Sequence, residues 1–166
     1  MNSKKIAWIL ANRKKSPVCC RKMMAVIPNL SWSFLNYEAD LIAISKQGYL
    51  REVEIKITLS DLRNDANKQK FINPHSGAFK DRSKWIKQFY YAIPRTLLDK
   101  ANRIQLYGSA GLITIDDNEC VEIIREAKIN TAANKLSLIQ AHKLMRLSSL
   151  KYWGRQLKES SEEGEK

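Results

Sequence analysis

Two acidic residues and a lysine interrupt apolar stretches that otherwise have the character of buried strands. Asp40 directly precedes the apolar run Leu41–Ile44, and Glu54 and Lys56 alternate with the apolar residues of Val53–Ile57. Carboxylates are poor strand formers and are costly to bury, so each of them needs a positive partner. A divalent cation such as Mg²⁺ or Mn²⁺ prefers oxygen ligands and is one candidate. The spacing therefore predicts a metal site, provided that the two runs face each other.

The break between the two runs predicts a β-hairpin. Residues 46–48 read Lys-Gln-Gly, and a three-residue loop with its glycine in the left-handed region would pair Ser45 with Tyr49. Counting back along both strands, that register sets Asp40 directly opposite Glu54. Opposed residues share a face of the sheet, with Cβ atoms about 4.5–5.5 Å apart.

Alternation of side chains extends this cluster along the second strand. Glu52, Glu54 and Lys56 are spaced two apart and share one face. Glu52 and Glu38 are possible additional metal ligands. A two-residue loop would shift the register by one residue and separate Asp40 from Glu54. An ion pair between Lys56 and Glu54, or between Lys56 and Asp40, is the alternative that requires no metal.

Asp40 followed by Glu54-Ile55-Lys56 resembles the D…(D/E)-x-K pattern of the PD-(D/E)xK nuclease superfamily, which has the restriction-endonuclease-like fold. The longer string EADLIAISKQGYLREVEIKIT, followed by a polar helix, FYYAIP and GLITIDD, is similar to the MmcB-like DNA-repair group within it. The resemblance covers residues 32–126. The chain departs from the pattern at Ala39, where many members have proline, and has no acidic residue before Glu38.

The resemblance implies a metal-dependent nuclease that hydrolyses phosphodiester bonds, with DNA as the expected substrate. Its setting would be DNA repair, recombination or the DNA processing of a bacterium, phage or mobile element. Asp40, Glu54 and Lys56 are the implied catalytic residues: Asp40, Glu54 and the carbonyl of Ile55 would hold Mg²⁺ or Mn²⁺, and Lys56 would orient the attacking water or stabilise the phosphate charge. The alternative is a non-catalytic nucleic-acid-binding module on the same fold.

The charge of the chain also favours a polyanionic partner. The net charge is +12, and residues 1–37 and 127–158 each hold seven Lys or Arg and no acidic residue. A generally basic protein with solvated lysines is the alternative explanation. The predicted nucleic-acid contacts are Lys14, Lys15, Arg21, Lys22, Lys68, Lys70, Lys143 and Arg146. We expect DNA as the partner, and a monomer or homodimer.

Composition predicts one globular domain over residues 1–158, followed by a disordered polar tail at 159–166. The chain has 166 residues, of which 44% are hydrophobic and 28% charged. No apolar run approaches the roughly 18–20 residues of a membrane-spanning helix, and no signal-peptide cleavage site follows Ile6–Ala11. We therefore expect a cytoplasmic protein with no membrane partner. The three cysteines lack the spacing of a zinc site or a disulfide framework.

The order of the predicted elements indicates the fold class. Helices are predicted at Lys4–Asn12 with Ser3 as cap, Thr58–Phe71 with Ser60 as cap, Arg95–Ala101 and Ala132–Leu157. Strands are predicted at Val18–Ile27, in the hairpin, and at Phe89–Ile93, Gly111–Ile115 and Cys120–Arg125, with an exposed loop over Asn73–Lys84. The last helix would dock through Leu136, Ile139, Leu147, Leu150 and Trp153. The pattern predicts an α/β sandwich with a mixed central sheet and a long C-terminal helix, and the resemblance implies the restriction-endonuclease-like α/β/α form.

Overall fold

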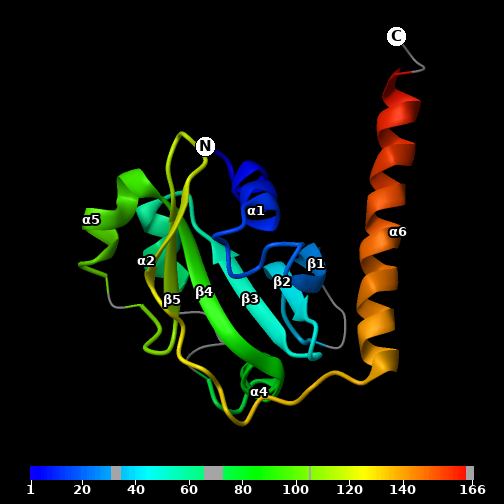
Figure 1. The fold of residues 1–166 in the computed structure, drawn as a ribbon, viewed down its shortest axis with the longest axis horizontal. Coiled ribbons are helices and arrows are strands. Elements are labelled where there is room, and N and C mark those ends of the chain that lie inside the picture. The colour runs from blue at the N-terminus through cyan, green and yellow to red at the C-terminus, as the bar shows by residue number, and fades with distance from the viewer. Residues whose placement is uncertain (31–34, 66–72, 105, 164–166) are drawn as a thin grey trace.

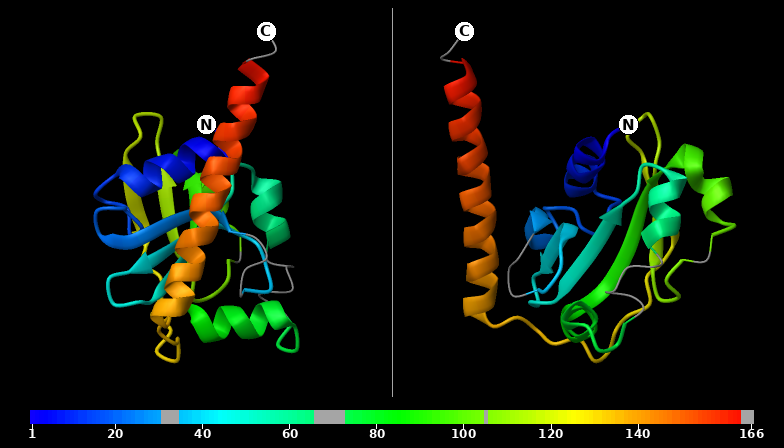
Figure 2. Two further views of the ribbon diagram at one scale, coloured as in Figure 1. Left: turned by 90° about the vertical axis from the view of Figure 1, so that its right-hand side faces the viewer. Right: turned by 180° about the vertical axis from the view of Figure 1, so that it is seen from behind.

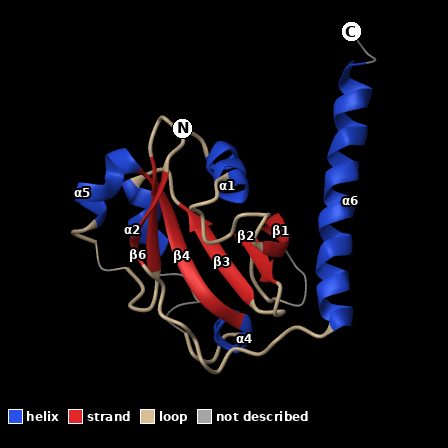
Figure 3. Ribbon diagram, viewed as in Figure 1, coloured by secondary structure: helices blue, strands red, loops and turns tan. Residues whose placement is uncertain are grey.

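The structure is a computed structural model that describes residues 1–30, 35–65, 73–104 and 106–163, with side chains up to Trp153. The helices are α1 (Ser3–Asn12), α2 (Leu59–Asp65), α4 (Gly77–Trp85), the 3₁₀ turn η1 (Arg95–Leu97), α5 (Leu98–Ala101) and α6 (Leu138–Glu163). The strands are β1 (Met23–Leu30), β2 (Ala39–Ser45), β3 (Leu50–Ile55), β4 (Ile86–Pro94), β5 (Gly111–Ile115) and β6 (Val121–Arg125). Figure 1 and Figure 3 show their arrangement.

The described strands form one mixed sheet in the order β1-β2-β3-β4-β5-β6. The first three strands are antiparallel neighbours, β3, β4 and β5 run parallel, and β6 returns antiparallel to β5. Parallel neighbours need a crossover connection, which α2 and α4 supply between β3 and β4. The predicted mixed sheet with a C-terminal helix is confirmed.

Helices cover both faces of the sheet, so the fold has three layers (Figure 2). On one face, Ile6 and Ile9 of α1 pack with Val53 of β3 and its neighbours. On the other face, Leu62 of α2 and Leu144 of α6 join a second apolar cluster. The apolar side chains of β3 divide between the two clusters, with Leu50 on one face and Val53 and Ile55 on the other. The result is an α/β/α sandwich.

The hairpin between β2 and β3 has the predicted register. Leu41 pairs with Val53 and Ile44 with Leu50. The amide of Ser45 donates to the Tyr49 carbonyl at 2.8 Å, which closes the three-residue loop. The glycine of that loop has a φ of 85°, the left-handed conformation that permits the turn.

Strand β1 differs from the predicted Val18–Ile27, because it begins at Met23 and continues through Pro28 to Leu30. Pro28 was expected to end the strand. β1 has β2 as its only neighbour in the described sheet, so the missing amide of Pro28 can fall on the unpaired side.

Two helices begin at other capping residues than those predicted. Asn2, rather than Ser3, caps α1 by accepting a hydrogen bond from the Lys5 amide at 2.8 Å. Thr58, rather than Ser60, plays that part for α2, accepting from the Asp61 amide at 3.1 Å. Several residues of equal capping tendency precede each helix, and packing selects between them. The predicted continuation of this helix over 66–71 lies outside the described residues.

The exposed loop predicted over Asn73–Lys84 is wrong, because most of this segment forms α4. Ser76 caps that helix by accepting a hydrogen bond from the Phe79 amide at 3.1 Å. Gly77 suggested a loop, but it occupies the first helical position, where a glycine interrupts no later turn.

The C-terminal helix begins six residues later than predicted and also ends later. Ser137 and Gln140 form a reciprocal capping box, with the Gln140 amide 3.2 Å from the Ser137 hydroxyl and the Ser137 amide 2.9 Å from the Gln140 side chain. Residues 159–163, which were expected to belong to a disordered polar tail, continue the helix, and 164–166 lie outside the described part. No helix in the described residues is long and apolar enough to cross a membrane.

Candidate functional site

The confirmed hairpin register places Asp40 opposite Glu54, where β2 begins and β3 ends. The paired residues end at Leu41 and Val53, so Asp40 and Glu54 are the next opposed positions. Asp40 is half-buried, and its Oδ2 accepts a hydrogen bond from the Ile55 amide at 2.8 Å. This contact extends the strand pairing by one step and holds the Asp40 carboxylate against the main chain of Ile55.

Lys56 lies between two buried carboxylates. Its Nζ is 2.9 Å from Glu54 Oε1 and 2.8 Å from Asp65 Oδ1. The side chains of Glu54 and Lys56 are only 4% and 8% exposed, and that of Asp65 is fully buried. The amide of Lys56 donates to the Ala92 carbonyl at 3.0 Å, which fixes this residue against β4. The predicted Glu54–Lys56 ion pair is therefore present, and α2 adds a second carboxylate to it.

Tyrosine hydroxyls satisfy the carboxylates behind this ion pair. Tyr91 of β4 donates to Asp65 Oδ2 at 2.9 Å. Burial, the Asp65 charge, the Asp65 hydrogen bond and the Glu54 charge all raise the pKa of Tyr91, so the hydroxyl keeps its proton and remains a donor. The sheet and α2 are thus connected through one polar chain, from Glu54 to Tyr91.

Glu52, a possible additional ligand, takes part in a second buried contact. It is fully buried and accepts a hydrogen bond from the Tyr37 hydroxyl at 2.8 Å. Burial and the Glu52 charge raise the pKa of Tyr37 well above its usual value, which keeps it protonated. In the hairpin register Glu52 pairs with Ile42, two positions further from the strand ends than Glu54. It lies deeper in the sheet than Asp40.

Glu38, the other possible ligand, is exposed and lies at the mouth of the site. Together with Asp40 it lines a hollow of about 200 Å³, which Asn29 and Lys151 also line. Lys151 of α6 donates through its Nζ to the Asn29 carbonyl. The C-terminal helix therefore contributes one positive charge to the rim around Asp40.

Buried acids outnumber buried bases by one among the described residues. Glu52, Glu54 and Asp65 are the buried acids, and Lys56 and Arg82 are the buried bases. Asp40 is half-buried, and so is Lys151, which lines the same hollow. Within the described residues, however, no group of three or more His, Cys, Asp or Glu side chains is arranged to hold a metal.

The predicted nucleic-acid contacts divide into two surfaces. Lys14, Lys15, Arg21 and Lys22 are exposed on the connection from α1 to β1, and Lys143 and Arg146 are exposed on α6. Lys68 and Lys70 lie outside the described residues. None of the six described cations lines the hollow at Asp40, where the cation is Lys151.

Sequence reasoning missed Asp65, Tyr91 and Lys151. A signal for Asp65 was available, since it lies three residues after the apolar Leu62 and therefore on the apolar face of the predicted helix. Tyr91 could have been marked as a buried tyrosine that requires a hydrogen-bond partner. Lys151 carried no signal, because only the placement of α6 beside β1 brings it to Asn29.

Comparisons with known proteins support the fold. Neither the protein-family models nor the curated proteins contain a match to this chain. The structure is similar to that of a protein of unknown function from Silicibacter pomeroyi, with a TM-score of 0.54 and 16% sequence identity, over 87% of this chain and 84% of the other. At this level of identity the likeness concerns the arrangement of helices and strands, and that arrangement is an α/β fold with a six-stranded mixed sheet.

Proposed function

We propose that this protein is a metal-dependent nuclease of the PD-(D/E)xK type. The observation that carries the proposal is the opposed pair Asp40 and Glu54 at a strand end, next to a buried lysine. A strand end is accessible to substrate, whereas a purely structural ion pair needs no opening beside it. Asp40 lines a hollow of about 200 Å³, which makes this member of the pair accessible, whereas Glu54 and Lys56 do not line it.

The residues present fit a hard divalent cation. Asp40 and Glu54 would hold it, with the Ile55 carbonyl as a third oxygen and Glu38 at the rim. Because Mg²⁺ and Mn²⁺ keep several water ligands, two carboxylates and one carbonyl are enough ligands from the protein. When bound, the ion would supply an activated water and neutralise phosphate charge. Asp65 and Tyr91 would hold the Lys56 ammonium in place, from which it stabilises the charge that develops on the scissile phosphate.

The basic surfaces would bind the nucleic acid on which this site acts. The exposed lysines and arginines of the α1–β1 connection and of α6 can neutralise backbone phosphates. Lys151 belongs to α6 and lines the acidic hollow. The helix would therefore bring one cation next to the scissile group. DNA is the proposed substrate.

Removal of either metal-binding carboxylate should abolish metal-dependent cleavage. We expect Asp40→Asn and Glu54→Gln to lower the rate with Mn²⁺ by more than the roughly 10–100-fold that loss of an outer-shell partner costs. Cleavage should be measured on single-stranded, duplex, branched and damaged DNA and on RNA. Melting temperatures of the same preparations separate lost chemistry from lost folding. Asp117→Asn, an exposed acid in the turn between β5 and β6, is the matched control and should keep full activity.

One observation favours the second candidate, a non-catalytic nucleic-acid-binding module. Lys56 already balances Glu54 and Asp65 without a metal, as a structural ion pair would. This candidate predicts salt-sensitive binding by the wild-type protein without cleavage of any of those substrates. Unchanged cleavage in both carboxylate variants would contradict the proposed nuclease site.

A further inference from the structure

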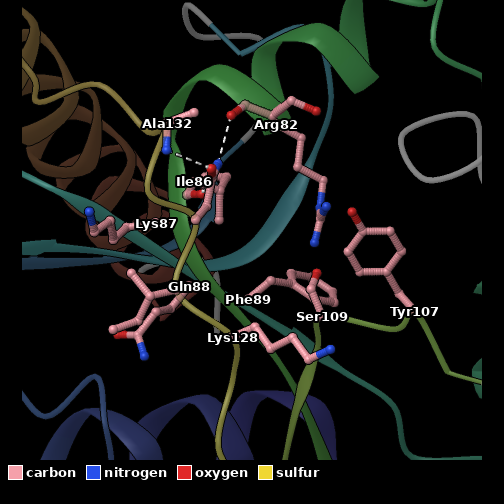
Figure 4. A pocket seen from close by; sticks show the side chains of 12 residues that line it. Arg82, Ile86, Lys87, Gln88, Phe89, Tyr107, Ser109, Lys128 and Ala132 are labelled. Atoms are coloured by element: carbon pink, nitrogen blue, oxygen red, sulfur yellow. Dashed lines mark hydrogen bonds between the residues drawn. The ribbon is translucent and has the colours of Figure 1, made fainter.

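A second cavity lies at the other end of β4 from Lys56 and is electropositive. It has a volume of about 450 Å³ and is lined by α4, the first residues of β4, residues 107–109 and residues 128–132. Its basic lining residues are Arg82, Lys87 and Lys128, and none of the described residues that line it is acidic. Figure 4 shows these side chains. Lys56 is held at Ala92, close to the end of β4, so the two sites are separated by most of that strand.

Arg82 is fixed at the wall of this cavity. The residue is only 6% exposed, and its Cζ lies 4.4 Å from the centre of the Phe89 ring and 4.3 Å from that of Tyr107. Contact with two aromatic rings restricts the planar guanidinium to one orientation. An arginine held in this way loses little conformational entropy when it binds an anion.

Arg82 and Ser109 both act on the hydroxyl of Tyr107. Burial acts in the opposite direction, but hydrogen bonds from Ser109 and Arg82 and the guanidinium charge lower the pKa of Tyr107 below its usual value. The local field therefore favours negative charge. In Figure 4, Lys128 extends towards Ser109 on the same side of the cavity as Arg82 and Tyr107.

The side chain of Lys87 points in a different direction from that of Lys128. Its Nζ lies 4.4 Å from the centre of the Tyr49 ring, and Figure 4 shows the side chain directed away from Arg82. Lys87 thus adds charge at the wall. The two cations that converge on one part of the cavity are Arg82 and Lys128.

Hydrogen bonds between segments fix the wall of the cavity. The Asn130 amide group donates to the carbonyls of Ser83 at 2.7 Å and Ile86 at 3.1 Å, and its backbone amide donates to the Lys87 carbonyl at 2.9 Å. These bonds tie the segment after β6 to the start of β4. The backbone amide of Lys128 is likewise bonded to the Ser109 carbonyl at 3.0 Å.

We propose that this cavity binds a phosphomonoester group of a nucleotide, with the phosphate held by Arg82 and Lys128. A guanidinium and an ammonium suit the oxygens of a phosphate. Ile86 and Ile129 line the cavity as apolar surface for the nucleoside. The volume lies within the roughly 300–1,000 Å³ of small-molecule sites. This site uses none of the residues of the proposed nuclease centre.

Calorimetry with the full chain in EDTA tests the proposal. EDTA removes divalent ions, so the acidic site cannot bind a nucleotide through a metal. The probes are dAMP, inorganic phosphate, deoxyadenosine and succinate. We expect saturable binding of dAMP, weaker binding of phosphate, and no binding of deoxyadenosine or succinate. Lys128 is exposed, so Lys128→Ala should fold, and loss of its charged contact should weaken dAMP binding by about tenfold or more. Lys100→Ala, an exposed lysine of α5, is the matched control.

Two further arms identify the source of the phosphate and separate this site from the nuclease centre. If a DNA oligonucleotide with a 5′-phosphate displaces dAMP better than the same oligonucleotide without it, the natural ligand is a strand end. If neither oligonucleotide displaces dAMP, the natural ligand is a free nucleotide. Asp40→Asn should bind dAMP like the wild type, even if the nuclease proposal fails. Equal binding of dAMP and deoxyadenosine, equal binding of succinate and phosphate, or unchanged affinity in Lys128→Ala would overturn the proposal.

Discussion

At the scale of single residues, Lys56 is the group on which the candidate site depends. It is bonded to carboxylates from two different elements, Glu54 on β3 and Asp65 on α2. Breaking a buried ion pair by removing one partner is costly because the other charge remains buried. Lys56 therefore contributes to stability whatever it does in catalysis, and loss of activity in a Lys56 variant would not by itself show a catalytic role.

Asp65 allows these two contributions to be separated. We expect Asp65→Asn to lower the free energy of unfolding by on the order of 3 kcal/mol, because Lys56 loses one of its two buried partners. The Tyr91 hydroxyl can still donate to the amide oxygen that replaces the carboxylate. Urea denaturation measures the change, and Mn²⁺ affinity should stay close to the wild-type value because Asp40 and Glu54 are retained.

Asp61→Asn is the control for this variant, since Asp61 lies on the same helix and is exposed. Its effect should remain within about 0.5 kcal/mol, as for most surface substitutions. Equal stability of Asp65→Asn and Asp61→Asn would show that the Lys56–Asp65 contact adds nothing to the fold.

At the scale of elements, the contact of β4 with β5 depends on a glycine. Tyr90 is buried, pairs with Gly111, and donates its hydroxyl to Glu126 at 2.7 Å. A Cβ at Gly111 would overlap the Tyr90 ring and come within 2.7 Å of the Ala127 backbone nitrogen. The ring crosses β5 only because residue 111 has no side chain.

We expect Gly111→Ala to lower the free energy of unfolding by about 1–3 kcal/mol, the usual cost of overfilling a core. Gly108→Ala is the matched control, because a Cβ there meets nothing within 4 Å. This substitution should leave the free energy of unfolding unchanged or raise it slightly, because alanine lowers the conformational entropy of the unfolded chain. Thermal denaturation of both variants is the measurement, and a Gly111→Ala protein as stable as Gly108→Ala would refute the packing argument.

Helix α6 illustrates an element whose existence, but not its docking face, followed from the sequence. Ile139, Leu150 and Trp153 were expected to dock, yet they are 69%, 55% and 61% exposed. Ala141 and Leu144 are buried instead. The capping box at Ser137 sets where the helix starts, and the path of the preceding segment along β4 sets which face meets the sheet.

At the scale of the whole molecule, the dominant property is the charge of +12. Release of counterions should make the affinity for nucleic acid fall as the salt concentration rises. The slope of the logarithm of the binding constant against the logarithm of the salt concentration should be about −0.9 for each phosphate neutralised on duplex DNA. Replacing Lys14 and Lys15 by alanine should reduce this slope by about two, because both are exposed and together can contact two phosphates.

Fluorescence anisotropy with a labelled duplex at several salt concentrations provides this slope. Lys100→Ala on α5 is the control and should leave it unchanged. An affinity that does not vary with salt, or an unchanged slope in the Lys14 and Lys15 double variant, would contradict binding through these two lysines.

The sequence by itself predicted the hairpin and, with a three-residue loop, the face shared by Asp40, Glu54 and Lys56, whereas the structure selected that register over the one with a two-residue loop. These features depend on local chemistry: a glycine that permits the left-handed turn, and strict alternation of side chains along extended backbone. The order of helices and strands along the chain and a mixed sheet were also predicted, because apolar runs of strand length alternate with turn residues and polar helices. The charge and its concentration at both ends of the chain are properties of the sequence alone.

Only the tertiary structure decided which residues complete the two sites. Asp65 and Tyr91 meet Lys56 because α2 crosses the face of β3 and β4, and Lys151 reaches Asn29 because α6 lies beside β1. Arg82 is enclosed by rings from β4 and from the segment before β5. Such contacts join residues far apart in the chain, and the packing of whole elements sets their geometry. Local propensity and spacing carry no information about that packing.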